Sequence, residues 1–192
     1  MQLLSSIGSR LRSSAACLIA DCRGIAATEF AIIMPMMLVL FFGTVEFSSG
    51  VAVDRKVTLM ARTLSDLTSQ SLAVTDTDLT NFFAAATGIM TPYSSTPTKS
   101  TISELYVDPA TKVARVQWSS GSTPHLPKDV IAIPVELQVG GTYLIYSEVS
   151  YLYTPTVGYV MAKAGINLKD SSYTRPRQST CVLYKTAACT VL

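Results

Sequence analysis

A single carboxylate, that of Glu29, lies near the start of an apolar run that extends from Ile25 to Val45. A run of about 20 apolar residues spans a membrane as a helix, and a carboxylate at the centre of such a helix costs roughly 2.5–3.5 kcal/mol. The cost is lower near the helix N-terminus, where the macrodipole and unpaired N–H groups favour negative charge. Glu29 therefore either meets a cation in the membrane or lies at the headgroup level.

The spacing around Glu29 indicates where such a cation could come from. Gly24, four further residues and then Glu29-Phe30 match the cleavage motif of type IV pilin-like precursors, in which a membrane peptidase cuts after the glycine. This resemblance implies a cleavage site between Gly24 and Ile25. The new amine of Ile25 would lie one helical turn, about 6 Å, from the carboxylate. In pilin-like families that carboxylate meets the N-terminal amine of a neighbouring subunit, so Glu29 and Phe30 become assembly residues.

A wider pattern includes the cleavage motif, and its segments are Arg23-Gly24, residues 27–35 and residues 43–47. The pattern closely resembles the TadE/TadF-like family, the minor pilins (pseudopilins) of the tight-adherence (Tad/Flp) pilus. The resemblance is specific from Arg23 to about Gly50 and weaker beyond, where residues 148–155 and 173–177 look like stretches that such proteins carry. The family implies an envelope-spanning pilus machine, processing by a prepilin peptidase and no catalysis by this subunit.

The charges before the apolar run predict its orientation. Three arginines and Asp21 precede the run, which gives this leader a net charge of +2, equal to that of the whole chain. Arginines on the N-terminal side place that side in the cytoplasm and the C-terminal region outside it. The mature protein would be formally neutral, and no basic cluster with interleaved aromatic residues follows. The sequence therefore does not favour nucleic-acid binding.

Other export signals fit less well. A lipoprotein signal would need a small residue before Cys22, where Asp21 stands. A conventional signal peptide is an alternative, because Gly50-Val51-Ala52 offers small residues at the positions that its peptidase reads. The long region before the apolar core and the position of Glu29 weigh against it.

The four cysteines divide into two pairs. Cys17 and Cys22 lie in the leader, where thiols stay reduced, and Cys181 and Cys189 lie near the exported C-terminus, in an oxidising compartment. We expect Cys181 and Cys189 to form a disulfide that contributes ~2–3 kcal/mol. The alternative is two free thiols.

The chain is expected to have an α+β fold, in which a long N-terminal transmembrane helix extends into a small periplasmic domain with an antiparallel sheet. The expected parts are a cleaved leader over 1–24, a transmembrane helix over 25–45, an exported continuation of the helix over 46–70 and a periplasmic α+β domain over 71–192. Pro35 should kink the membrane helix, which neighbouring helices can tolerate.

Apolar residues of the exported helix form a seam with spacings of four and three: Val53, Val57, Met60, Leu64 and Leu67. We expect the seam to pack on the sheet of its own domain; the alternative is contact with other pilin-like subunits. A second helix is predicted over Asp78–Ala86, with Thr77 or Asp76 as N-cap and Gly88 at its end.

Three strands are predicted: Ile102–Val107 and Lys112–Trp118 around a turn, and Tyr143–Tyr153. The last has the clearest alternation. Its first face would carry Tyr143, Ile145, Val149 and Tyr151, and its second Leu144, Tyr146, Glu148 and Leu152. The segments 91–100 and 121–128 are predicted loops.

Catalytic and metal sites lack the residues they need. The one histidine, His125, is expected to be solvated in a loop, and no zinc pattern, phosphate loop or nucleophile serine occurs. Glu148 is a candidate buried acid, although the solvent side of a sheet is more common for a carboxylate. Arg175 and Arg177 either are solvated or bind an acidic partner, and the strand tyrosines form core packing rather than an adhesive face. We expect no enzyme, no cofactor and no metal.

These observations favour a single-pass inner-membrane minor pilin of a tight-adherence (type IVc) pilus, needed for pilus assembly, adhesion and biofilm formation. The partners expected are the prepilin peptidase, the other minor pilins and the major pilin, the inner-membrane assembly platform and the membrane itself. The alternative is a membrane-anchored periplasmic binding or adhesion protein that enters no filament. A type II secretion pseudopilin shares the cleavage motif but fits the Pro35 context less well.

Overall fold

The computed structural model describes residues 24–155, 165–185 and 189. The chain divides into two compact units, an N-terminal unit that ends at Val45 and a C-terminal unit that begins at Glu46. The expected leader, with its arginines, Cys17 and Cys22, lies outside the described residues except for Gly24.

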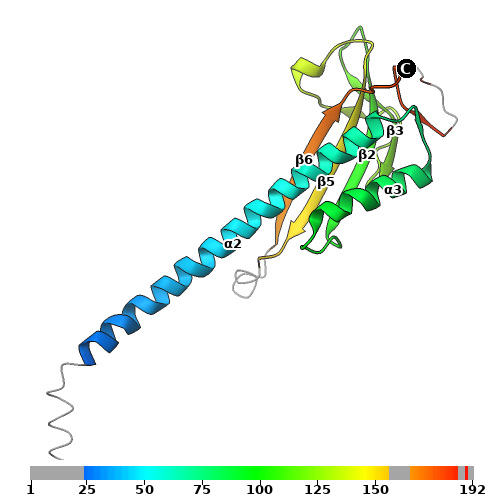
Figure 1. Cartoon of the computed structure of the whole chain (residues 1–192). Coiled ribbons are helices and arrows are strands. Elements are labelled where there is room, and N and C mark those ends of the chain that lie inside the picture. The colour runs from blue at the N-terminus through cyan, green and yellow to red at the C-terminus, as the bar shows by residue number, and fades with distance from the viewer. Residues whose placement is uncertain (1–23, 156–164, 186–188, 190–192) are drawn as a thin grey trace, which may run out of the picture. The chain divides into compact units, whose positions relative to one another are not determined.

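The C-terminal unit contains both helices and strands (Figure 1). In chain order the elements are α2 (Gly24–Ser69), β1 (Ala73–Val74), α3 (Asp76–Thr87), the 3-10 helix η1 (Gly88–Met90), β2 (Thr98–Val107), β3 (Ala114–Gly121), β4 (Val130–Ile131), the 3-10 helix η2 (Val135–Leu137), β5 (Tyr143–Tyr153), β6 (Ile166–Thr174) and β7 (Leu183–Tyr184).

The long helix α2 contributes residues to both units. From Glu46 onward it is amphipathic, with Val53, Val57, Met60 and Leu64 fully buried. These side chains belong to one apolar cluster with Ile145 and other residues of the sheet. The expected seam therefore packs on the sheet of its own unit, and its last member, Leu67, is half-buried. At the end of α2 the backbone N–H of Arg177 donates to the Ser69 carbonyl at 2.9 Å.

Five strands of the described chain form a sheet in the order β4-β3-β2-β5-β6, with every neighbouring pair antiparallel. The fold class expected from the sequence, a long apolar helix followed by a small domain with an antiparallel sheet, is confirmed. The register between β2 and β3 shifts at Glu104/Leu105. Such a bulge bends the strand and re-aims the side chains beyond it.

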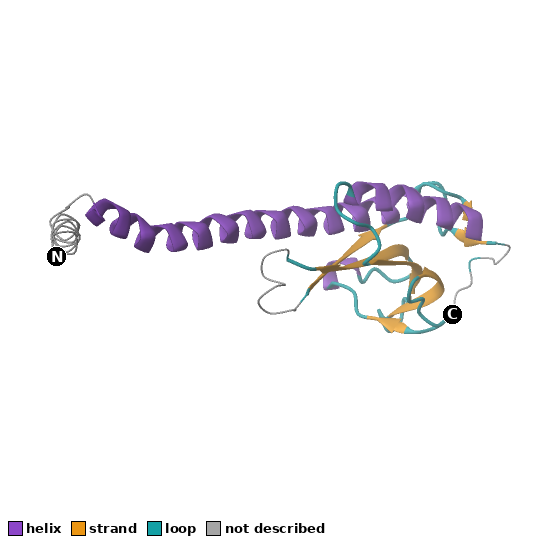
Figure 2. Cartoon of the chain, turned by 90° about the horizontal axis from the view of Figure 1, so that it is seen from below, coloured by secondary structure: helices purple, strands orange, loops and turns teal. Residues whose placement is uncertain are grey.

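The two faces of this sheet have different covers. Figure 2 shows the helices on one side of the sheet and η2 on the other. The helix face carries the cluster of α2 and α3 residues with Trp118, Val149 and Tyr151. The outer face carries a second cluster, which residues 131–137 cover in part: Leu105, Val107, Ala114, Val116, Leu144, Tyr146, Ile133, Ile131 and Leu137. Because both faces are covered there, the first five residues of β5, from Tyr143 to Ser147, are all buried.

The helix α3 begins earlier than the sequence suggested. Its N-cap is Thr75, so the expected N-caps Thr77 and Asp76 are wrong. The Thr75 side chain accepts from the Asp78 N–H at 3.3 Å, and the Asp78 carboxylate accepts from the Thr75 N–H at 2.9 Å. This reciprocal capping box satisfies two helix N-terminal donors at once. Gly88 caps the other end, as expected.

Strand limits also differ from expectation. β3 starts at Ala114 rather than Lys112, because Lys112 has a positive φ of 60° within the turn. It continues to Gly121, and β2 starts at Thr98, inside a segment expected to be loop. The strand β5 has the limits that were predicted, and its alternate residues fall on the predicted faces.

The C-terminal segment returns to the core. β7 pairs with β1 in parallel, and Val182 is fully buried. A disulfide joins Cys181 to Cys189, whose Cα atoms are 6.1 Å apart. The expected disulfide is thus present in the structure.

Candidate functional site

The first turns of α2 contain the residues assigned to cleavage and assembly. Gly24 is the first residue of the helix, and the Thr28 hydroxyl donates to the Ile25 carbonyl at 2.8 Å. Glu29 follows Ile25 by four residues, which is about 6 Å along the axis. Among the described residues, its carboxylate has no hydrogen-bond or ion-pair partner. The carboxylate is therefore open to a partner from another chain.

The N-terminal unit presents an apolar helix surface on all sides. Every residue from Gly24 to Val45 is exposed, and α2 is, within the described chain, the one helix long and apolar enough to cross a membrane. Pro35 lies inside the helix and lacks the N–H that would reach the Ala31 carbonyl. A helix that is apolar on all sides is at home in lipid or among other helices. The large exposed apolar side chains here include Ile32, Ile33, Met36, Met37, Val39, Leu40 and Phe41.

In the C-terminal unit, polar contacts attach α2 to β5 and β6. The Ser147 hydroxyl donates to the Ala61 carbonyl at 2.5 Å, and the Ser65 hydroxyl bonds to that of Ser172 at 3.0 Å. The hydroxyl of Thr58 bonds to the carboxylate of Asp170. Short side chains at these positions let the helix approach the strands closely. The helix therefore has a fixed rotation about its axis relative to the sheet.

Glu104 is a buried acid that the sequence reasoning missed. Its side chain is on the helix face of β2, and the residue is 2% exposed. One carboxylate oxygen accepts from the Trp118 indole N–H at 3.0 Å, and the other from the backbone N–H of Val182 at 2.6 Å. Burial raises the pKa of Glu104 to about 7, and these two hydrogen bonds oppose the shift. The signal was available in the alternation of Ile102, Glu104 and Tyr106, which places an acid at an inward position.

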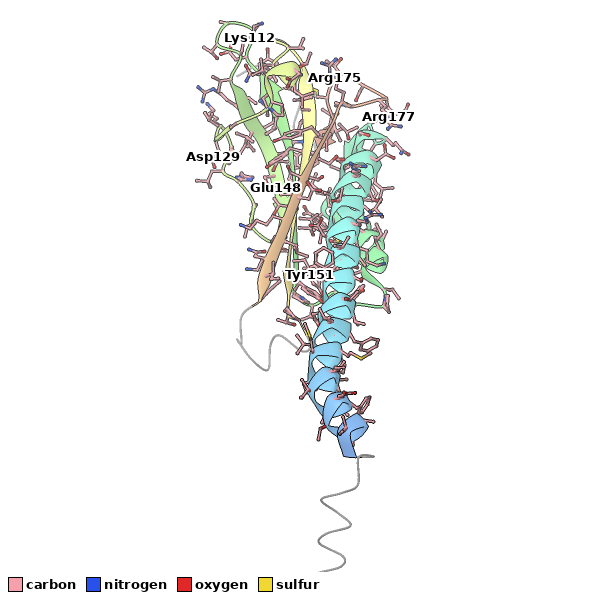
Figure 3. The ribbon with its side chains drawn as sticks, turned by 90° about the vertical axis from the view of Figure 1, so that its left-hand side faces the viewer. Lys112, Asp129, Glu148, Tyr151, Arg175 and Arg177 are labelled. Carbon is pink, nitrogen blue, oxygen red and sulfur yellow. A yellow bond between two sulfur atoms is a disulfide. The ribbon has the colours of Figure 1, made fainter. Side chains whose placement is uncertain are left out.

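His125 and Glu148 form a pair, so the expectation of a solvated histidine is wrong. The His125 Nε2 atom lies 2.5 Å from the Glu148 carboxylate, with side-chain exposures of 27% and 37%. The other Glu148 oxygen accepts from the Tyr146 hydroxyl at 2.8 Å. Burial, followed by this bond to Glu148, raises the pKa of Tyr146. Glu148 and Tyr151 project from opposite faces of β5, with Tyr151 toward α2 (Figure 3).

The tyrosines of β5 and the two arginines after β6 differ in their surroundings. The tyrosines of β5 are core residues, with exposures of 6% for Tyr143, 8% for Tyr146, 5% for Tyr151 and 8% for Tyr153. Arg177 is not simply solvated, because its guanidinium pairs with Asp66. The Arg175 side chain forms no hydrogen bond or ion pair within the described residues, and that residue is exposed.

In the described part of the chain, no three His, Cys, Asp or Glu residues are grouped so that they could hold a metal ion. The histidine pair with Glu148 lacks a third ligand of this kind. The described residues thus form an exposed apolar helix and a packed domain, and they contain no constellation typical of catalysis.

Comparison with known proteins gives one match. No curated protein and no solved structure matches the chain. The matching family is described as TadE-like protein, and its model covers residues 24–64. The match begins at the first residue of α2, and it includes Glu29, Pro35 and the buried seam from Val53 to Leu64. Over residues 24–64, the chain is therefore similar to the TadE-like protein family, which the sequence resemblance had indicated.

Proposed function

We propose that this protein is a minor pilin-like subunit of a tight-adherence pilus, anchored by the N-terminal part of α2 in the bacterial inner membrane. The observation that carries the proposal concerns the part of α2 from Gly24 to Val45. It combines an exposed apolar surface with one carboxylate, unpartnered among the described residues, one turn after the expected cleavage point. The TadE-like match over this same segment supports it. In this proposal the C-terminal unit is periplasmic and the leader cytoplasmic.

The assembly chemistry follows from the position of Glu29. After cleavage by a prepilin peptidase, the Ile25 amine is a cation at the start of an apolar helix. The free-energy cost of placing either charge alone in lipid, the Ile25 amine or the Glu29 carboxylate, is high. Bringing the amine of one subunit to the carboxylate of the next lowers the cost of both, since opposite charges attract strongly at low dielectric. The helices of neighbouring subunits would then be held in a defined register.

The C-terminal unit would supply partner recognition. Its core already contains the seam of α2 from Val53 to Leu64, so this seam is not free for assembly. Contacts with the other minor pilins, the major pilin and the assembly platform would use exposed surfaces of the unit. Pilus assembly, and through it adhesion and biofilm formation, would depend on them.

The first experiment is to determine the N-terminal sequence and intact mass of the protein from membranes of a cell with its native peptidase. The proposal predicts a start at Ile25 and a chain of 168 residues, the 192 of the precursor less the 24 of the leader. A start at Met1 would mean a plain membrane anchor, and a start at Val53 a secreted domain. Either result would favour a binding or adhesion protein outside any filament.

A further inference from the structure

No described segment lies over the outer sheet face around Lys99, Ser150 and Lys169, and this part of the face is polar. Two hollows of about 620 and 470 Å³ lie on it, and they share four lining residues. These residues come from β2, β5, β6 and the segment after β3: Lys99, Thr123, Ser150 and Lys169. We call this region the basic hollow.

The strand register places two lysines in one row of the basic hollow. Lys99 is opposite Ser150, and Ser150 is opposite Lys169. Because neighbouring strands lie about 4.8 Å apart, the two lysine Cα atoms are about 10 Å apart on the same face. Both side chains are exposed, and their long stems allow both ammonium groups to reach a single ligand.

The two carboxylates near these lysines are held in hydrogen bonds to other groups, although their negative charges remain. Two carboxylates occur among the residues that line the larger hollow, Glu148 and Asp170. Glu148 is engaged through both oxygens, by His125 and Tyr146, and Asp170 bonds to Thr58 on the helix face. Neither lysine forms an ion pair with another residue in the described ranges. Like charges in one row of a sheet do not stabilise it, so the pair has no evident role in folding.

One wall of the basic hollow is held in place before any ligand arrives. The Thr101 hydroxyl lies 3.3 Å from that of Thr123, and the Thr123 N–H donates to Thr101 at 3.2 Å. The His125 N–H donates to the Ser119 hydroxyl at 3.0 Å, while the His125 ring contacts Glu148. Because these hydrogen bonds already hold the segment from Thr123 to His125, a ligand that binds there would cost it little further conformational entropy.

We propose that the basic hollow binds an anionic oligosaccharide, whose acidic groups contact Lys99 and Lys169 and whose hydroxyls meet Ser150, Thr101 and Thr123. A peptide fits less well for two reasons. The hollow lies over β2 and β5, and β5 is already paired on both sides, by β2 and β6, so no strand can be added between them. The larger hollow also offers few apolar side chains as anchors: Tyr146 and Val149 line it, and the Tyr146 ring is stacked on Tyr173.

The test is calorimetric titration of the full-length protein in neutral detergent. The probes are tetragalacturonate for carboxylates, glucose 6-phosphate for phosphate, maltotetraose as neutral sugar and hexaglutamate as acidic peptide. We expect one or both acidic sugars to bind, with affinity that falls as salt rises, and no binding of maltotetraose. Which acidic sugar binds identifies the acidic group. Absence of both, equal binding of maltotetraose, or tighter binding of hexaglutamate overturns the proposal.

A charge-matched pair of variants tests the site itself. Lys99→Gln with Lys169→Gln should weaken binding of the acidic sugar by at least about tenfold, which corresponds to ~1.4 kcal/mol. Lys112→Gln with Lys128→Gln removes the same charge at positions that do not line the hollow, and should change affinity by less than about twofold. All four lysines are exposed, so both variants should melt like the parent. If both double variants lost the same affinity for the acidic sugar, the effect would come from overall charge, and the assignment of the site to the basic hollow would be overturned.

Discussion

The phenol of Tyr153 donates a hydrogen bond of 3.0 Å to the carboxylate of Glu46, which joins the last residue of β5 to the first residue of the C-terminal unit. Gly50 lies beside the same ring, since a Cβ there would be 3.6 Å from Tyr153. Burial, followed by the bond to Glu46, raises the pKa of Tyr153 to about 12. Within the C-terminal unit, this hydrogen bond holds the C-terminal end of β5 next to α2.

Tyr153→Phe removes this hydrogen bond and keeps the ring. We expect a loss of about 1 kcal/mol in the free energy of unfolding, because the Glu46 carboxylate loses a donor in a half-buried place. The change is measured by urea denaturation. Tyr93→Phe is the matched control, since the Tyr93 hydroxyl forms no hydrogen bond with a described residue. Equal stability of the two variants would show that the Tyr153 hydroxyl contributes nothing.

Glu104 should make stability fall with rising pH. Burial is the main cause of its raised pKa, about 7 against 4.5 for the unfolded group. The folded state therefore binds the proton more tightly, so stability is highest below pH 4.5 and falls as pH rises through 7. The fall is at most about 3 kcal/mol.

Glu104→Gln tests this linkage. Glutamine does not titrate, so the variant should lose the part of the pH dependence that lies between pH 4.5 and 7. It has one acceptor oxygen for two donors, so it should be less stable than the parent at pH 5. Parallel stability curves for the two proteins over this pH range would contradict the role given to Glu104.

Local pattern predicted α2, α3, β2, β3 and β5, but it did not predict the strands β1, β4, β6 and β7. The contacts that it missed join residues far apart in the sequence. The spacing of the α2 seam and the alternation of β5 gave the helix, the strand and their faces. The partner of Glu104 is Val182, 78 residues further along the chain, and no local pattern indicates that pairing. The same holds for His125, which meets Glu148 only because the segment after β3 folds over β5. The cleavage site between Gly24 and Ile25 and the assembly role of Glu29 and Phe30 could be predicted from the sequence because their motif is local, and they stay predictions.

Reduction of the disulfide should loosen the C-terminal segment. Cys181 and Cys189 are eight residues apart, and closing so short a loop contributes roughly 2–3 kcal/mol in the chain-entropy model. Cys189→Ser leaves the buried Cys181 side chain in place and removes only the link. We expect a lower melting temperature in this variant, and no further decrease on adding reductant. A reductant-sensitive Cys189→Ser protein would contradict the assignment of this pair.

Glu29→Val tests the assembly chemistry. Valine is apolar, so insertion of the helix becomes easier, and the cleavage point between Gly24 and Ile25 is untouched. Membrane amounts and N-terminal processing should therefore match the parent, measured by immunoblot and N-terminal sequencing. Pili should be absent by electron microscopy, because the Ile25 amine of the next subunit has lost its partner.

Asp54→Asn is the matched control for that variant. It also removes one carboxylate from α2, at an exposed position of the C-terminal unit whose side chain forms no hydrogen bond or ion pair within the described residues. Piliation should be normal in this variant. If Glu29→Gln restores pili, a polar hydrogen bond suffices and charge pairing is wrong. If Glu29→Val itself makes normal pili, Glu29 lies at the headgroup level with no role in assembly.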